Sequence, residues 1–213
     1  MQQTDSTRNN ARHAMNILIS VIAIFTTAVG AAGDAASLPG HTPKLMSTLL
    51  APEGPARLTV TTSAFRNGAE IPRPNTQYGG NQFPDLRWSR GPDGTRSYVV
   101  VMQGQSMEQP DTGTTVHFLL FNVPADTTRL NRGMTTAPTG AVAGTNLHGN
   151  AEIYAGPHTH TAEKHAYHFQ VFALDSALQP ALPASFENVV SAMHGHVRAS
   201  GEVVGWAART DGE

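Results

Sequence analysis

Two short, strongly apolar runs constrain most what this chain can fold into. They cover Tyr98–Met102 and Val116–Val123, and the second contains one histidine near its start, His117. The first run is continuously apolar, as a strand buried on both faces would be, and the second is of the same kind and ends at Pro124. The sequence therefore predicts a mainly β fold built around buried strands.

Weaker patterns predict the other elements. Apolar and polar residues alternate in Leu58–Thr62 and in the second half of Tyr154–Asp175, which predicts two further strands. Ser185–Met193 begins with a candidate capping serine and places apolar residues on one helical face, which predicts one late helix. We expect a polar loop from Gln103 to Thr114 and a long loop over 125–153.

Composition limits the class of protein. The 213 residues suit one domain with a substantial core, and the 20 glycines and 14 prolines indicate many loops. Charged residues make up only 14% of the chain and the net charge is −2, so there is no basic surface of the kind that nucleic acid requires. No cysteine is present, which excludes a disulfide.

The N-terminus has the layout of a secretory signal peptide. Arg8 and Arg12 precede an uncharged stretch, Ala14–Gly33, and the apolar centre of this stretch, Ile17–Phe25, is followed by small residues that offer several cleavage sites. An uncleaved membrane anchor is the alternative, because the stretch approaches the roughly 20 residues that span a bilayer. We therefore expect a periplasmic or secreted protein. The predicted division is a signal peptide at 1–36, a linker at 37–56 and one domain at 57–213.

Seven segments, in order, resemble the phosphatidylethanolamine-binding proteins, and specifically their bacterial Raf kinase inhibitor-like branch. Together they span about 58–207. They are Leu58–Pro72, Asn81–Ser89, Gly91–Tyr98, His117–Ala125, Tyr154–Pro157, His165–Asp175 and Ala192–Gly205. The resemblance implies a large antiparallel sheet packed on a smaller sheet, with peripheral helices. It also implies a small pocket at one end of the sheet that holds a phosphate or a phospholipid head group.

The resemblance also implies which residues form this pocket. His117 matches the histidine that begins a strand, and His165 and Tyr167 match an H-R-Y-like motif with alanine in place of arginine. Tyr154 and Pro157 match the turn that leads to it and would shape the wall. We expect a non-enzymatic binding protein for a small anion, without a cofactor. Two copies could form a homodimer, and any other protein partner is unknown.

One element of the family pattern is missing. The family has a D-P-D-A-P loop after the buried strand, and its two aspartates fall here on Gly104 and Ser106. A carboxylate beside a histidine raises the pKa of the imidazole, so without it His117 and His165 should be protonated less often. Glu108 or Asp111 could substitute from nearby.

Two other kinds of site are open as alternatives. His158 and His160 alternate, as two metal ligands on one strand face would, and His165 could supply a third nitrogen. The segment around Ser106 is a near miss to the nucleophile elbow of hydrolases, with His117 as a candidate base, but its second glycine is absent. The sequence thus predicts an anion pocket, with a metal site or a serine hydrolase as alternatives.

Overall fold

The computed structural model describes residues 41–42, 44–149, 152–160 and 162–209. The predicted signal peptide at 1–36 lies outside the described residues.

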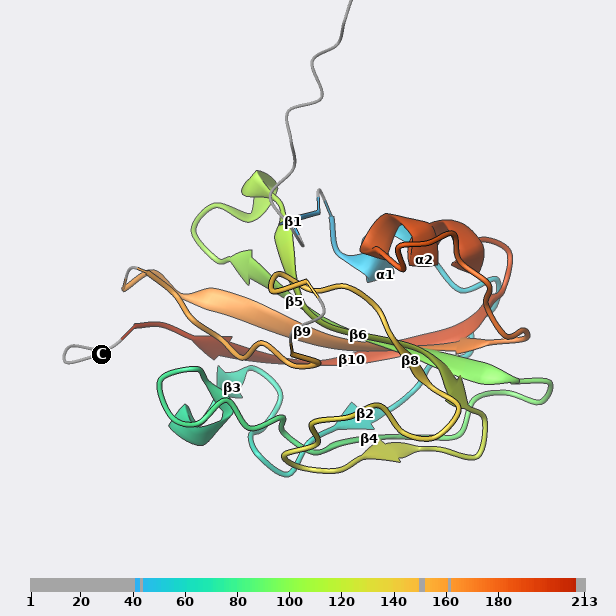
Figure 1. Ribbon diagram of the computed structural model, residues 1–213, viewed down its shortest axis with the longest axis horizontal. Helices are drawn as coiled ribbons and strands as arrows, with labels where there is room; N and C mark the ends of the chain where they lie inside the picture. Colours follow the sequence, from blue (N-terminus) through green and yellow to red (C-terminus); the bar gives the residue numbers. More distant parts are fainter. Residues whose placement is uncertain (1–40, 43, 150–151, 161, 210–213) are drawn as a thin grey trace, which may run out of the picture. The chain divides into compact units, whose positions relative to one another are not determined.

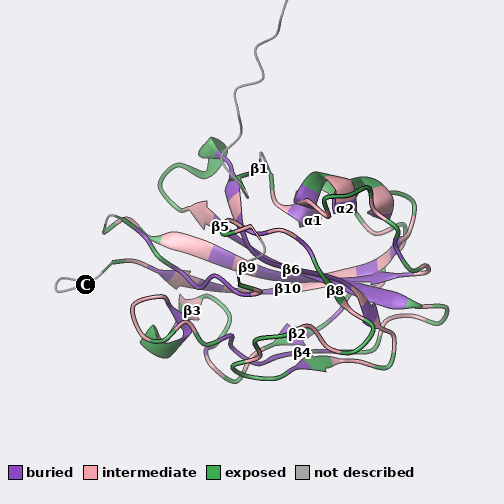
Figure 2. Cartoon of the chain, in the orientation of Figure 1, coloured by how far each residue is buried: buried purple, intermediate pink, exposed green. Residues whose placement is uncertain are grey.

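The centre of the fold is one large sheet. Its strands are β1 (His41–Thr42), β3 (Ala69–Glu70), β5 (Ser97–Ser106), β6 (Thr114–Pro124), β8 (Val142–Ala143), β9 (His165–Leu174) and β10 (Val197–Ala207). They pair in the order β1-β6-β5-β9-β10-β3, with β8 also on β6 (Figure 1). Every pairing is antiparallel except that of β10 with β3, which is parallel. The two apolar runs of the sequence lie in β5 and β6, where nearly every residue is buried (Figure 2).

Both faces of this sheet are covered, which explains the continuous apolar runs in its strands β5 and β6. One face packs against a small antiparallel sheet of β2 (Val60–Thr61), β4 (Leu86–Trp88) and β7 (Arg129–Leu130). The other face packs against α1 (Met46–Leu49) and α2 (Phe186–Met193) (Figure 1). The expected fold class, a large sheet on a smaller one with peripheral helices, is confirmed.

The late helix forms where its apolar period predicts it. Ser185 caps α2, because its hydroxyl accepts a hydrogen bond from the backbone N–H of Asn188 at 3.3 Å. The buried side of the helix consists of Phe186, Val189, Val190 and Met193. In the described part of the chain, no helix has the length and apolarity needed to cross a bilayer.

The structure differs from the sequence prediction at the end of β5. The polar loop expected from Gln103 begins later, because β5 continues to Ser106 and the Gln103 side chain is fully buried. The amide oxygen of Gln103 accepts a hydrogen bond from the backbone N–H of Met46 at 2.7 Å. The side-chain amide oxygen of Gln170, which is also buried, accepts one from the backbone N–H of Ser47 at 2.8 Å. These donors belong to the stretch that the sequence predicts to be a linker. The described part of that stretch packs on the large sheet through β1, α1 and the buried side chains of Met46 and Leu50.

Candidate functional site

Three adjacent strands bring the predicted pocket residues together. In the register of the sheet, Gly104 on β5 lies opposite Tyr167 on β9 and Thr115 on β6. His117 follows two residues after Thr115, and residues two apart on a strand share one face. The rings of His117 and Tyr167 meet edge to face, with centroids 5.1 Å apart.

Gly104 is the residue that permits this close approach. A Cβ atom at this position would lie 2.8 Å from Nε2 of His117 and 2.9 Å from Cε1 of Tyr167. Both distances are too short for carbon contacts. The two rings therefore occupy space that any side chain at position 104 would need.

A cavity of about 440 Å³ opens at this end of the strands. Among the described residues, five histidines line it, two from the strands and three from loops. The lining is Gln77, Gly104, Thr115, His117, Leu147, His148, His158, His160, His165 and Tyr167. His117 is almost fully buried, whereas the three loop histidines are exposed.

Four of the seven predicted ligand-binding residues line this cavity: Gly104, His117, His165 and Tyr167. Ser106, Tyr154 and Pro157 are not among its described lining residues. Tyr154 is buried, and its hydroxyl donates to the carbonyl of Asn75 at 2.7 Å. Pro157 is also buried, and its carbonyl accepts from the backbone N–H of Gln77 at 3.1 Å.

The protonation of His117 follows from its surroundings. Its Nδ1 lies 2.7 Å from the carbonyl oxygen of Ala155, and because a carbonyl can only accept, Nδ1 carries the proton. The pKa of His117 is lowered to about 4, chiefly by burial and to a lesser extent by the nearby His148 and His165, while the hydrogen bond to Ala155 opposes the change. At neutral pH the imidazole is neutral and its Nε2 is a hydrogen-bond acceptor.

Among the described lining residues, the side chains other than His117 that can carry a positive charge are all histidines. No lysine, arginine, aspartate or glutamate is among the described lining residues, and both Glu108 and Asp111 are exposed and lie outside the lining. The pKa of His158 is lowered, by burial and then by the neighbouring His160. Burial raises the pKa of the Tyr167 hydroxyl, which therefore stays protonated.

His148 was not predicted from the sequence, because it lies in a loop without periodicity. The loop is held against β6 by the backbone N–H of Leu147, which donates to the carbonyl of Val116 at 2.9 Å. Asn146 and Gly149 close a tight turn with two backbone hydrogen bonds, and the N–H of His148 donates to the Asn146 side chain. The Asn-x-x-Gly pattern is the one local signal that could have indicated this turn.

The alternative metal site is not assembled. No group of three histidine, cysteine, aspartate or glutamate side chains in the described residues is arranged to hold one ion. His158 and His160 meet edge to face with ring centroids 4.9 Å apart, and the ring of Tyr78 lies 5.0 Å from that of His158. These contacts are those of packed aromatic rings.

The alternative hydrolase dyad is not formed either. The hydroxyl of Ser106 donates to the carboxylate of Glu163 and accepts from the backbone N–H of Gln109 at 2.7 Å. The described hydrogen bonds of Ser106 go to Glu163 and Gln109, and that of the His117 ring goes to Ala155, so the expected Ser106–His117 pair is not formed among the described residues.

Comparison with known proteins gives a consistent result. The family model described as phosphatidylethanolamine-binding protein matches residues 61–207. A "UPF0098 protein" of Methanothermobacter thermautotrophicus is 33% identical over 153 residues, which are 70% of this chain and 97% of the relative.

Two solved structures are similar in both fold and sequence. Escherichia coli YbcL, described as a new member of the mammalian PEBP family, has a TM-score of 0.64 and 26% identity, covering 73% of this chain and 100% of its own. A putative PEBP homologue from Chlamydia trachomatis has a TM-score of 0.63 and 27% identity, covering 72% of this chain and 99% of its own.

Proposed function

We propose that this chain, which belongs to the phosphatidylethanolamine-binding protein family, is an exported, non-enzymatic binding protein for a small anion. The ligand would be phosphate or the phosphorylated head group of a phospholipid. The observation that carries the proposal is the histidine-lined cavity, in which His117, His165 and Tyr167 meet beside Gly104.

The cavity suits an anion that also carries a hydrogen-bond donor. His117 is neutral and offers the Nε2 lone pair, so it would accept a hydrogen bond from the P–OH group of hydrogen phosphate or from an ammonium group. The more exposed histidines, His148, His160 and His165, would offer ring N–H groups as donors to the oxygens of the anion.

The proposal includes that the protein has no catalytic activity. The nucleophile candidate, Ser106, is hydrogen-bonded to Glu163 and not to a histidine.

The proposal that the protein is exported rests on the sequence pattern of residues 1–36. Expression of the full chain in a bacterium should yield a protein that lacks these residues, which mass spectrometry of the intact product measures. A product that retains residue 1 would contradict export by cleavage.

The binding proposal is tested by NMR of the histidine rings in the full chain. Phosphate and phosphoethanolamine are titrated at constant ionic strength, at pH 6.0 and at pH 7.5. We expect saturable shifts of the His117 and His165 ring signals with both ligands.

Matched variants give the test its control. His165→Gln should weaken phosphate binding, whereas His194→Gln, which changes an exposed histidine outside the cavity, should leave it unchanged. If neither the His117 nor the His165 signal moves with either ligand, the anion proposal fails.

A further inference from the structure

A second and larger cavity lies next to the histidine cavity. Its volume is about 710 Å³. Its described lining is Gly80, Asn81, Met134, Thr135, Thr136, Ala137, Ala143, Gly144, Glu152, Ile153 and Tyr154. None of these residues lines the histidine cavity. Cavities of this size, about 300–1,000 Å³, are the ones that hold small-molecule ligands.

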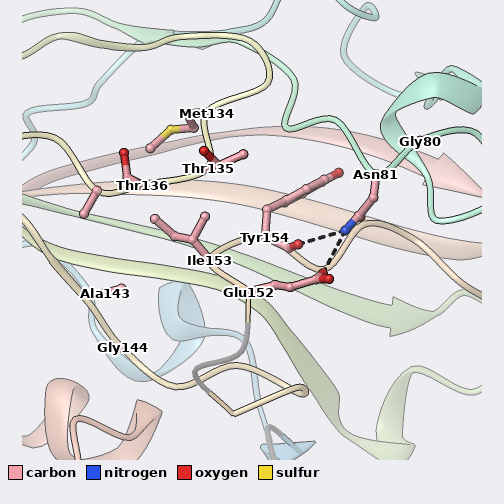
Figure 3. Close-up of a pocket in the computed structure, with 11 residues that line it drawn as sticks. Gly80, Asn81, Met134, Thr135, Thr136, Ala143, Gly144, Glu152, Ile153 and Tyr154 are labelled. Carbon is pink, nitrogen blue, oxygen red and sulfur yellow. Dashed lines mark hydrogen bonds between the residues drawn. The ribbon is translucent and has the colours of Figure 1, made fainter.

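The lining combines an apolar wall with a single charge. Met134, Ile153 and the two alanines supply apolar surface, and Asn81 and the threonines supply neutral polar groups (Figure 3). Glu152 is the only charged side chain among the described lining residues. A ligand that matches this lining has an apolar body and one positive charge.

One carboxylate oxygen of Glu152 accepts a hydrogen bond from Asn81, and the other is accessible to a ligand. Its Oε2 accepts a hydrogen bond from the Asn81 side-chain amide at 3.0 Å, and the same amide lies 3.1 Å from the carbonyl of Tyr154 (Figure 3). Oε1 of Glu152 makes no hydrogen bond to another described residue. One oxygen therefore orients the carboxylate while the other remains available to a ligand.

Asn81 is itself rigidly placed. Its backbone has a φ of 54°, in the left-handed region where asparagine is among the few tolerated side chains. Its Oδ1 accepts from the backbone N–H of Gly156 at 2.7 Å, so both ends of the amide are used. This fixed amide means that Glu152 does not have to be ordered when a ligand binds, and less entropy is lost.

We propose that this cavity is a second binding site, which takes a small amine with an apolar body. The ammonium group pairs with Glu152, and the apolar body packs against Met134 and Ile153. The site goes beyond the proposed anion function. The two cavities adjoin, because Nδ1 of His148 in the histidine cavity lies 3.9 Å from Oε2 of Glu152.

The experiment uses two probes of matched shape and opposite charge, 4-phenylbutylamine and 4-phenylbutyrate. Each is added to the full chain at pH 7.5 while NMR follows the methyl signals of Met134 and Ile153. We expect saturable shifts with the amine, and binding of the carboxylate that is at least about fivefold weaker, the factor that corresponds to an ion pair at an exposed site.

Three variants assign the binding to this cavity. Glu152→Gln keeps an acceptor for Asn81 and removes the charge, so it should weaken amine binding by about fivefold and remove the preference for the amine. Thr136→Trp places a large ring in the cavity from an exposed lining position and should abolish binding of both probes. Thr139→Trp, at an exposed position of the same loop outside this lining, should bind as the parent does.

The phosphate titration distinguishes a failure of the amine site from a failure of the proposed anion site. The phosphate titration should be unaffected by Thr136→Trp, which also verifies that this variant is folded. The second site is refuted if the Met134 and Ile153 signals do not respond to the amine. It is also refuted if Glu152→Gln leaves the affinity for the amine unchanged.

Discussion

His117 should make the folded protein lose stability in acid. Burial lowers its pKa from the ordinary 6.5 to about 4, so the folded state resists a proton that the unfolded state accepts. The contribution of this pKa difference to the free energy of unfolding is fully present above pH 6.5 and is lost as the pH falls toward 4. Each unit of pKa difference is worth about 1.4 kcal/mol, so we expect this one residue to account for a loss of about 3 kcal/mol between pH 7.5 and pH 4.0.

Urea unfolding of the full chain at these two pH values measures the effect. His117→Asn removes the titrating ring, and its amide can still donate to the carbonyl of Ala155. The variant should start out less stable because its smaller side chain leaves a void, but it should lose about 3 kcal/mol less on acidification. Carboxylates common to both proteins cancel in this comparison. His194→Asn should follow the parent, and parallel losses in the parent and His117→Asn would refute the reasoning.

Two further substitutions test the packing around the site, each by urea unfolding at pH 7.5. Gly104→Ala should lower the free energy of unfolding by about 1–3 kcal/mol, because its Cβ would lie 2.8 Å from Nε2 of His117. An unchanged value would show that the rings of His117 and Tyr167 can move aside without cost. Gln103→Leu should cost about 1–3 kcal/mol, because the backbone N–H of Met46 loses its buried acceptor. The control Gln105→Leu, at a partly exposed position next to the site, should cost less than about 1 kcal/mol, and an equal cost would contradict the role of the buried network.

The β strands could be predicted because their signal is local. Val99, Val100 and Val101 are buried from both sides, and that double burial is visible as an unbroken apolar run. The end of β5 could not be predicted, because Gln103 looks like a loop residue when its neighbours alone are read. Its buried amide accepts from Met46, 57 positions earlier, and no local pattern reports a hydrogen bond of that range.

The candidate site likewise has residues that could be predicted from the sequence and contacts that could not. His117, His165 and Tyr167 follow from strand positions and from the family resemblance, and they do line one cavity. His158 and His160, which the sequence offered as metal ligands, are exposed and line the cavity as well. Between them in the chain, the carbonyl of Thr159 accepts a hydrogen bond from the hydroxyl of Tyr78, 81 positions away. A contact of this kind depends on the completed fold.

Glycine at position 104 and the histidines of the loops belong to one physical arrangement. An aspartate there would bring a charge to pair with His117, but its Cβ would meet the ring that now fills the space. With glycine, His117 packs against Tyr167, stays neutral and contributes an acceptor in place of a charge. In the proposed anion site, the buried pair of His117 and Tyr167 sets the shape of the cavity, and the exposed loop histidines form its outer lining.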